Sequence, residues 1–177
     1  RIQRACREMG IKTVAVHSTA DADAMHVRLA DESVCIGPPA PAQSYLNMHQ
    51  ILSAATISNA EAIHPGYGFL AENADFAREV ESAGLIWVGP TPDQITLLGD
   101  KVAAKRAALD ANVPTTPIWE ISDEQIANGV APDGVPMPAL VKAAAGGGGR
   151  GMRIVTDTAL LADSITSASR EAKAAFG

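Results

Sequence analysis

The sequence predicts an α/β protein in which helices pack against a parallel sheet. Hydrophobic residues make up 47% of the 177 residues and charged residues 19%, a composition typical of one or two globular domains. Up to about residue 90, segments with helical periodicity alternate with short β-branched segments, as in successive βαβ units. Beyond residue 90, two helical segments follow each other directly, and a run of four glycines stands between two strand-like segments.

Helices and strands are expected to alternate over residues 1–90. The expected helices are 1–10, 21–30, 45–56 and 73–84, and the expected strands are 11–17, 33–37, 60–65 and 85–89. In the first helix, apolar side chains recur with the spacing i, i+3, i+4 and i+7 at Ile2, Ala5, Cys6 and Met9. Residues 37–42 contain three prolines and are expected to form a loop, because proline cannot donate to a strand ladder.

The ends of these helices follow from residue type. Ser44 is expected to cap the third helix, in which Leu46, Ile51 and Leu52 face inward. Asn73 is expected to cap the fourth helix. Glycines are expected to end the first and fourth helices, at Gly10 and Gly84.

The chain begins within this alternation, because its first helix has no strand before it. Parallel sheets are wound from strand–helix–strand units. A strand is therefore expected before Arg1, and we interpret the chain as part of a longer protein.

The second part of the chain has a different organisation. Helices are expected at 91–99, 100–112 and 157–176, and strands at 138–144 and 152–156, with extended structure over 113–120. Thr91 and Asp100 are expected N-caps, and Asn112 ends the second helix. One face of the last helix carries Leu161, Ile165, Ala168, Ala172 and Phe176. The boundary is expected near residues 89–99, giving domains of residues 1–90 and 91–177.

Charge and composition limit the classes of function. The 14 Lys and Arg against 20 Asp and Glu give a net charge of -6, which argues against nucleic acid as the main partner. The sequence has no run of 18 apolar residues and no signal-peptide pattern, so no membrane association is expected. Cys6 and Cys35 are expected to be buried free thiols, which suits a reducing compartment such as the cytoplasm.

The glycine run, Gly146 to Gly149, has several interpretations. A flexible linker is disfavoured, because the run is short and lies between two expected strands. Gly146, Gly148 and Gly151 match a dinucleotide-binding pattern, with Glu171 about 20 residues on. That pattern requires a helix after the glycines, whereas a strand is expected here.

The sequence around the glycine run matches a Walker A loop and a protein-kinase glycine loop less well than it matches a β-hairpin flap. A Walker A loop needs Lys and Ser or Thr after its last glycine, where Met152 and Arg153 stand. A kinase loop has its lysine on the following strand, whereas Lys142 lies on the preceding one. The remaining interpretation is a β-hairpin flap whose backbone N–H groups and basal lysine cover a polyphosphate.

The stretch VKAAAGGGGRGMRIV resembles the glycine-rich flap of the ATP-grasp fold, in the form carried by biotin carboxylases. Further stretches resemble the same family in the same order: RACREMGIKTVAVHS, HVRLADESVCIGPP, SYLN, AIHPGYGFLAEN, FAREVESAGLIWVGP, LLGDKVAAK and REAKAAF. The resemblance implies a parallel-sheet, Rossmann-like N-terminal domain that precedes ATP-grasp. The first, incomplete part of an ATP-grasp domain with its glycine-rich hairpin would follow.

The resemblance also implies a reaction. Biotin carboxylases use MgATP and bicarbonate to form carboxyphosphate, which carboxylates biotin on a carrier domain. A homo-oligomer working with a carboxyltransferase is implied, in the cytoplasm or, in a eukaryote, in the mitochondrial matrix or plastid. The magnesium ligands and the catalytic base of the family are expected beyond Gly177. The chain by itself is therefore expected to be inactive, with residues 145–151 as its most mobile internal stretch.

Site residues are implied position by position. The ATP-binding positions of the family match Lys101, Lys142, Gly146, Gly147, Gly148, Gly149 and Met152. A loop on the biotin and bicarbonate side matches His64, Gly66, Tyr67, Gly68 and Glu72. Outside the motifs, Lys101 would be an exposed lysine, Met152 a core residue and HPGYG a turn. His17, His26 and His49 are expected to be surface or packing residues.

The sequence departs from the family at several points, including a shortened segment before PALVKA, and two alternatives remain. Ala144 and Ala145 stand where many members have Ser-Gly, and Ile118 stands where a glycine is usual. Another carboxylate–amine ligase of the ATP-grasp class would keep the glycine flap but lack HPGYGFLAEN. A non-catalytic nucleotide-binding module is the second alternative, if the chain is natively this short.

Overall fold

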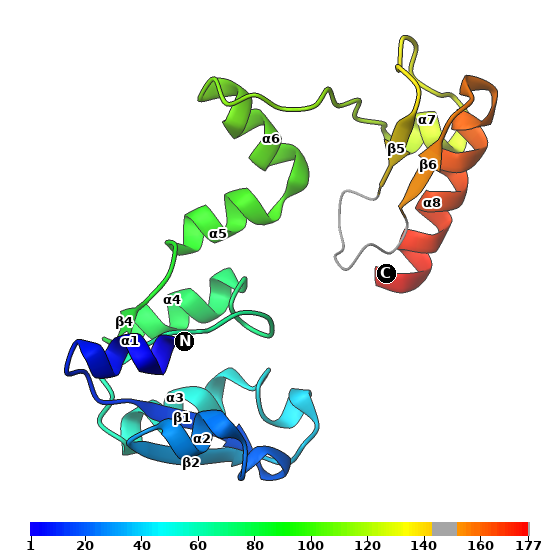
Figure 1. The fold of residues 1–177 in the computed structure, drawn as a ribbon. Helices are drawn as coiled ribbons and strands as arrows, with labels where there is room; N and C mark the ends of the chain where they lie inside the picture. The colour runs from blue at the N-terminus through cyan, green and yellow to red at the C-terminus, as the bar shows by residue number, and fades with distance from the viewer. Residues whose placement is uncertain (143–151, 177) are drawn as a thin grey trace. The chain divides into compact units, whose positions relative to one another are not determined.

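The computed structural model describes residues 1–142 and 152–176, and the chain divides into two compact units, Arg1–Thr96 and Leu97–Gly177. Figure 1 follows the elements in chain order. The first unit contains α1 (Ile2–Glu8), β1 (Val14–Ser18), η1 (Thr19–Asp21), α2 (Met25–Leu29), β2 (Glu32–Gly37), η2 (Pro41–Gln43), α3 (Met48–Ile57), β3 (Ala62–Ile63), α4 (Ala74–Ser82) and β4 (Ile86–Trp87).

The strands of the first unit pair in parallel, which confirms the predicted α/β class. β1 pairs with β2 from Val14↔Glu32 to His17↔Cys35, and the register shifts before Ser18. β3 pairs with β4 through Ala62↔Ile86 and Ile63↔Trp87. The described residues therefore form two separate two-stranded sheets here. In each pair the strands run side by side, so their carboxyl ends meet at one edge.

The core of the first unit gathers around α4. Phe76, Ala77 and Val80 on one face of this helix are buried, and the Phe76 ring meets Trp87 edge-on at 5.6 Å between ring centres. Burying each large apolar side chain contributes about 1.5–3 kcal/mol. The Asn73 side chain accepts a hydrogen bond from the Phe76 N–H, as predicted for the cap of this helix. This cap and core fix the segment that follows the HPGYGFL motif.

The predicted cap of α3 was wrong. The helix begins at Met48, and Asn47 caps it by accepting from the Gln50 N–H. Ser44 is fully buried, and its hydroxyl donates instead to the Ala40 carbonyl. Leu46 therefore precedes the helix and is 44% exposed, whereas Ile51 and Leu52 pack against the core as predicted.

Three further predictions need correction. Neither thiol is buried: Cys6 is half-buried, and Cys35 is exposed because it alternates along β2 with the buried Ile36. Of the helix predicted over 21–30, only Met25–Leu29 is α-helical, and the short 3-10 turn η1 before it ends at Asp21. In β4 only Trp87 is buried, since Ile86 lies 64% exposed on the opposite face.

Helix α5 (Pro92–Gly99) crosses the boundary between the units, and the second unit continues from it. Its elements are α6 (Lys101–Asp110), α7 (Asp123–Ala127), β5 (Ala139–Val141), β6 (Arg153–Val155), η3 (Thr158–Leu160) and α8 (Leu161–Phe176). The predicted caps are present: Thr91 exchanges hydrogen bonds with Gln94, and Asp100 caps α6. Asn112 ends α6 at a φ of 56°.

Helix α8 supplies the core of the second unit. Leu161, Ile165 and Ala168 are buried on one face, as predicted, and Val155 of β6 is buried with them. The side chains of Ala172 and Phe176, predicted on the same face, lie outside the described part of the chain. Of the helices described, none combines the length and apolar character needed to cross a membrane.

Candidate functional site

The two strands predicted to carry a phosphate flap form an antiparallel pair. Leu140 pairs with Ile154, and Val141 pairs with Arg153. Lys142 and Met152 come next on the two strands, so they stand at the same end of the hairpin, and both are exposed. The glycines predicted to contact phosphate, Gly146 to Gly149, lie outside the described residues.

The two faces of this hairpin differ in burial. Val141 and Val155 turn toward α8, and Val155 is 3% exposed. On the other face, Leu140 is 54% and Ile154 75% exposed. The Arg153 guanidinium also donates to the Glu171 carboxylate, which links β6 to α8. One face of the hairpin therefore packs against α8, and its opposite face presents apolar side chains to solvent.

Lys101 lies on a different element, at the first position of α6. The Asp100 carboxylate already accepts from the backbone N–H groups of Val102, at 2.9 Å, and Ala103, at 2.7 Å. The start of α6 is thus capped internally and does not offer these donors to an anion. The N-terminal end of a helix carries a partial positive charge, so the positive charge of Lys101 at this position does not stabilise α6.

The HPGYGFL motif forms a loop that leaves β3 and enters α4. Gly66 and Gly68 have φ of 68° and 72°, and Phe69 has φ of 43°. Such a conformation costs a bulky residue about 1–2 kcal/mol, so Phe69 needs a compensating contact. His64 Nδ1 accepts from the Gly66 N–H at 3.0 Å, which leaves Nε2 to carry the proton in the neutral ring.

The residues predicted on this loop differ in exposure. Leu70 is buried in the core beside Phe76 and anchors the loop at its end. His64 and Glu72 are exposed, and Tyr67 is 95% exposed. The loop therefore brings His64, Gly66, Tyr67 and Gly68 into one short exposed segment, anchored in the first unit.

A hydrogen-bonded group beside this loop was missed by the sequence reasoning. Tyr45 Oη donates to Asp21 Oδ2 at 2.5 Å and accepts from the Ser18 N–H at 2.8 Å. Ser18 Oγ donates to the same Asp21 oxygen at 2.7 Å. The spacing Ser-x-x-Asp is typical of the start of a helical turn, so it could have indicated the Ser18–Asp21 part.

This group changes the acidity of its members. Hydrogen bonds from the Tyr45 and Ser18 hydroxyls hold the pKa of the Asp21 carboxyl below its usual value. Burial, together with donation to Asp21, raises the pKa of the Tyr45 phenol above its usual value. Both shifts favour the arrangement in which Asp21 is ionised and Tyr45 keeps its proton.

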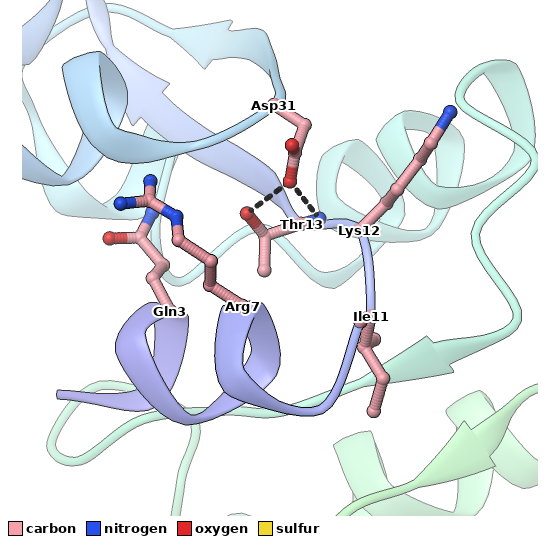
Figure 2. A pocket seen from close by; sticks show the side chains of 7 residues that line it. Gln3, Arg7, Ile11, Lys12, Thr13 and Asp31 are labelled. Atoms are coloured by element: carbon pink, nitrogen blue, oxygen red, sulfur yellow. Dashed lines mark hydrogen bonds between the residues drawn. The ribbon is translucent and has the colours of Figure 1, made fainter.

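A separate groove of about 190 Å³ lies where α1 meets the start of β1 (Figure 2). Asp31 accepts there from the backbone and the hydroxyl of Thr13, and these bonds lower the pKa of its carboxyl. The Arg7 guanidinium donates to the Leu29 carbonyl, and Lys12 points away from Arg7. Because Asp31 and Arg7 already have hydrogen-bond partners within the protein, this groove is not the candidate site.

Histidines and acidic groups form no metal site in the part of the chain described here, since no three of His, Cys, Asp or Glu gather. His17 is buried, with Nδ1 2.9 Å from the Ser18 carbonyl oxygen. His26 Nε2 lies 3.2 Å from the Val16 carbonyl oxygen. Both rings thus have backbone partners, and His49 is exposed.

Comparison with known proteins covers the whole chain. The family model described as "Biotin carboxylase, N-terminal domain" matches residues 1–95. The model described as "Carbamoyl-phosphate synthase L chain, ATP binding domain" matches residues 100–177. A biotin carboxylase of Pseudomonas aeruginosa is 56% identical over 180 residues, and the human mitochondrial propionyl-CoA carboxylase alpha chain is 44% identical over 179.

These relatives are longer than the chain, which is matched over its full length. The match spans 40% of the Pseudomonas protein and 24% of the human one. The solved complex of a Campylobacter jejuni biotin carboxylase with "beta-gamma-ATP" is similar, with a TM-score of 0.87, 41% identity and coverage of 99% of this chain and 40% of that one. The biotin carboxylase domain dimer of Hydrogenobacter thermophilus 2-oxoglutarate carboxylase, solved with MgADP, ADP and bicarbonate, has a TM-score of 0.83 at 43% identity and covers 100% and 39%.

Proposed function

Since the chain belongs to the biotin carboxylase family, we propose that it forms part of an enzyme that carboxylates biotin. The complete enzyme would use MgATP and bicarbonate to form carboxyphosphate, which transfers its carboxyl group to biotin on a carrier domain. The observation that supports this most is the antiparallel pairing of β5 and β6 within the match to an ATP-binding domain. That hairpin stands where phosphate contacts are expected.

Residues on the hairpin suit an ATP site chemically. Lys142 offers an ammonium group to a phosphate, and the exposed Met152 offers an apolar surface to a base. Lys101, from α6, would supply a second ammonium. Bound magnesium would neutralise phosphate charge in the complete enzyme. We propose that the main contribution of this chain to the reaction is to bind and orient ATP.

The loop His64–Leu70 would border the other substrates. We propose that its exposed groups, with Glu72, face biotin and bicarbonate. The amide and ring donors of the loop suit an anion or a ureido group. A carrier domain and self-association of the complete protein are part of the proposal, and the dimer described for the Hydrogenobacter thermophilus domain supports the latter.

The test replaces the two lysines by methionine in the complete protein. Methionine keeps most of the stem and removes the charge, so packing should persist. Each of Lys101→Met and Lys142→Met is expected to weaken ATP binding about 10- to 150-fold, because each removes a charge-assisted bond to phosphate. The double variant should deviate from the sum of the single effects, since groups that share a ligand couple.

The measurement is nucleotide titration together with bicarbonate-dependent ATP cleavage in the presence of biotin. Lys12→Met is the matched control, because Lys12 is an exposed lysine of the first unit, whereas the hairpin belongs to the second. If Lys101→Met bound ATP as the wild type does, Lys101 would not belong to the site. If the wild-type protein cleaved ATP without any response to bicarbonate and biotin, the proposed reaction would be wrong.

A further inference from the structure

The HPGYGFL loop is attached to the rest of the first unit by an aromatic contact near its end. The Phe69 ring stacks on the Tyr45 ring, with 5.0 Å between the ring centres and 21° between the planes. Phe69 is 60% exposed and has φ of 43°, so burial does little to hold this unfavourable backbone conformation. The stack with Tyr45 is the contact that can compensate for it.

Tyr45 is itself held from two directions. Its hydroxyl donates to Asp21 and accepts from the Ser18 N–H, at the carboxyl end of β1. Ser18 closes the group by donating to Asp21. A tyrosine hydroxyl has one proton and two acceptor positions, so these two bonds restrict rotation of the phenol. The ring therefore presents a fixed face to Phe69.

This arrangement joins three segments that are distant in sequence. They are the end of β1 with η1, the segment before α3, and the loop after β3. In open parallel sheets, ligands bind beyond the carboxyl ends of the strands, which is where β1 and β3 each lead into these segments. The contacts thus connect one strand end with the loop that leaves another.

We propose that Tyr45 is a positioning residue for the loop His64–Leu70, through its stack on Phe69 and its hydrogen bonds to Asp21 and Ser18. This inference rests on the proposed function for its consequence in catalysis: Tyr45 would act on biotin binding through the loop. Its consequence for the loop conformation is independent of that function.

The first test measures the loop itself, by amide hydrogen exchange of the complete protein without substrates. The Gly66 and Ala71 N–H groups are suitable reporters, because the first bonds to His64 Nδ1 and the second to the Gly68 carbonyl. Tyr45→Phe keeps the ring but loses both hydroxyl bonds, and we expect exchange of these amides to become about tenfold faster. Phe69→Leu removes the stack while leaving the hydroxyl group in place, and should give a similar acceleration.

Two further variants serve as controls. Ser58→Ala removes a hydroxyl bond to the Ala54 carbonyl at the other end of α3, and should leave the loop amides unchanged. Phe69→Tyr keeps an aromatic ring and should preserve wild-type exchange. The inference is overturned if the Gly66 and Ala71 amides of Tyr45→Phe exchange at rates within about twofold of the wild type. It is also overturned if Ser58→Ala accelerates exchange of these amides as much as Tyr45→Phe does.

The second test distinguishes a role of Tyr45 in positioning the loop from a general loss of folding or activity. In bicarbonate-dependent ATP cleavage, Tyr45→Phe and Phe69→Leu should raise the KM for biotin about tenfold and leave the KM for ATP within about twofold. A purely structural role would lower kcat or active fraction without this selectivity, and that outcome would overturn the catalytic part. If the wild type does not carboxylate biotin, the proposed function fails, and the exchange result still decides whether Tyr45 holds the loop.

Discussion

At the scale of single residues, Asp21 shows how one half-buried carboxylate can organise its surroundings. It accepts from two hydroxyls, those of Tyr45 and Ser18, and neither donor is adjacent to it in sequence. Hydrogen bonds to an ionised carboxylate favour that form, which is why the pKa of Asp21 is lowered. The bond from Tyr45 to Asp21 requires the phenol to remain protonated, and after burial it is a further cause of the raised pKa of Tyr45.

This linkage predicts a pH dependence of folding. The pKa of Asp21 is lower in the folded state than its ordinary value, so its contribution to stability is complete above that ordinary value. The contribution is lost as pH falls through the lower, folded value. Asp21→Asn should therefore reduce the free energy of unfolding at pH 7 and flatten its decline below about pH 4.

The measurement is denaturant unfolding at a series of pH values from 7 to 2. Asp23→Asn is the matched control, because Asp23 is two residues away, 98% exposed, and 3.8 Å from the Arg28 guanidinium. Asp23→Asn removes the same charge and should keep the wild-type dependence of the free energy of unfolding on pH. A profile for Asp21→Asn that runs parallel to the wild type through the acid range would contradict the assignment.

At the scale of elements, the end of β2 depends on a backbone position that only glycine can occupy. Gly37 has φ of 142°, and a Cβ there would press directly against the Gln43 carbonyl oxygen of the backbone. Backbone atoms cannot move aside as a flexible side chain can. The close approach fixes how the chain turns from β2 through the proline-rich segment toward Tyr45.

Gly37→Ala is therefore expected to destabilise the protein by more than about 2 kcal/mol, through strain at φ and a steric clash. Gly99→Ala is the matched control. A Cβ at Gly99, the last residue of α5, would meet nothing within 4 Å, so the change should be neutral or stabilising by about 0.4–1 kcal/mol. Thermal and denaturant unfolding would measure both, and equal effects would show that Gly37 is not constrained.

At the scale of the whole molecule, the residues that the structure describes form two cores that share no residue. One contains Phe76, Val80 and Trp87 of the first unit, and the other contains Val155, Leu161 and Ile165 of the second. Each is closed by an amphipathic helix, α4 or α8, lying against strands of the same unit. The family models divide in the same region, at residues 95 and 100.

We expect core substitutions in the two units to act independently. Phe76→Ala and Ile165→Ala should each cost about 2–5 kcal/mol, because each leaves a cavity. The double variant should equal the sum within about 0.5 kcal/mol, since distant sites without shared partners add. Hydrogen exchange should show faster opening only in α4 for the first variant and only in α8 for the second. A coupling energy above about 1 kcal/mol would indicate one cooperative core.

Local chemistry in the sequence was sufficient for much of the fold. Asn73 and Asp100 cap their helices as expected, because a cap needs only a side-chain oxygen beside N–H groups two or three residues on. The alternation of helices and strands likewise predicted parallel pairing, and the glycine run between two expected strands predicted the β5–β6 hairpin. The family motifs identified the candidate ATP and biotin residues, but their roles remain predictions.

Tertiary contacts decided what local chemistry left open. Ser44 and Asn47 are both residue types that can cap a helix. The buried Ser44 hydroxyl donates to the Ala40 carbonyl instead, and Asn47 caps α3. The contacts that bring Tyr45 to Asp21 and Phe69 span 24 residues in each direction, and no local period encodes them. Sequence alone thus determined most of the elements and several of their ends, because those depend on neighbours within a helical turn. Only the folded structure determined which polar groups are buried together and what holds the HPGYGFL loop, because those depend on segments that are distant in sequence and meet only in the folded chain.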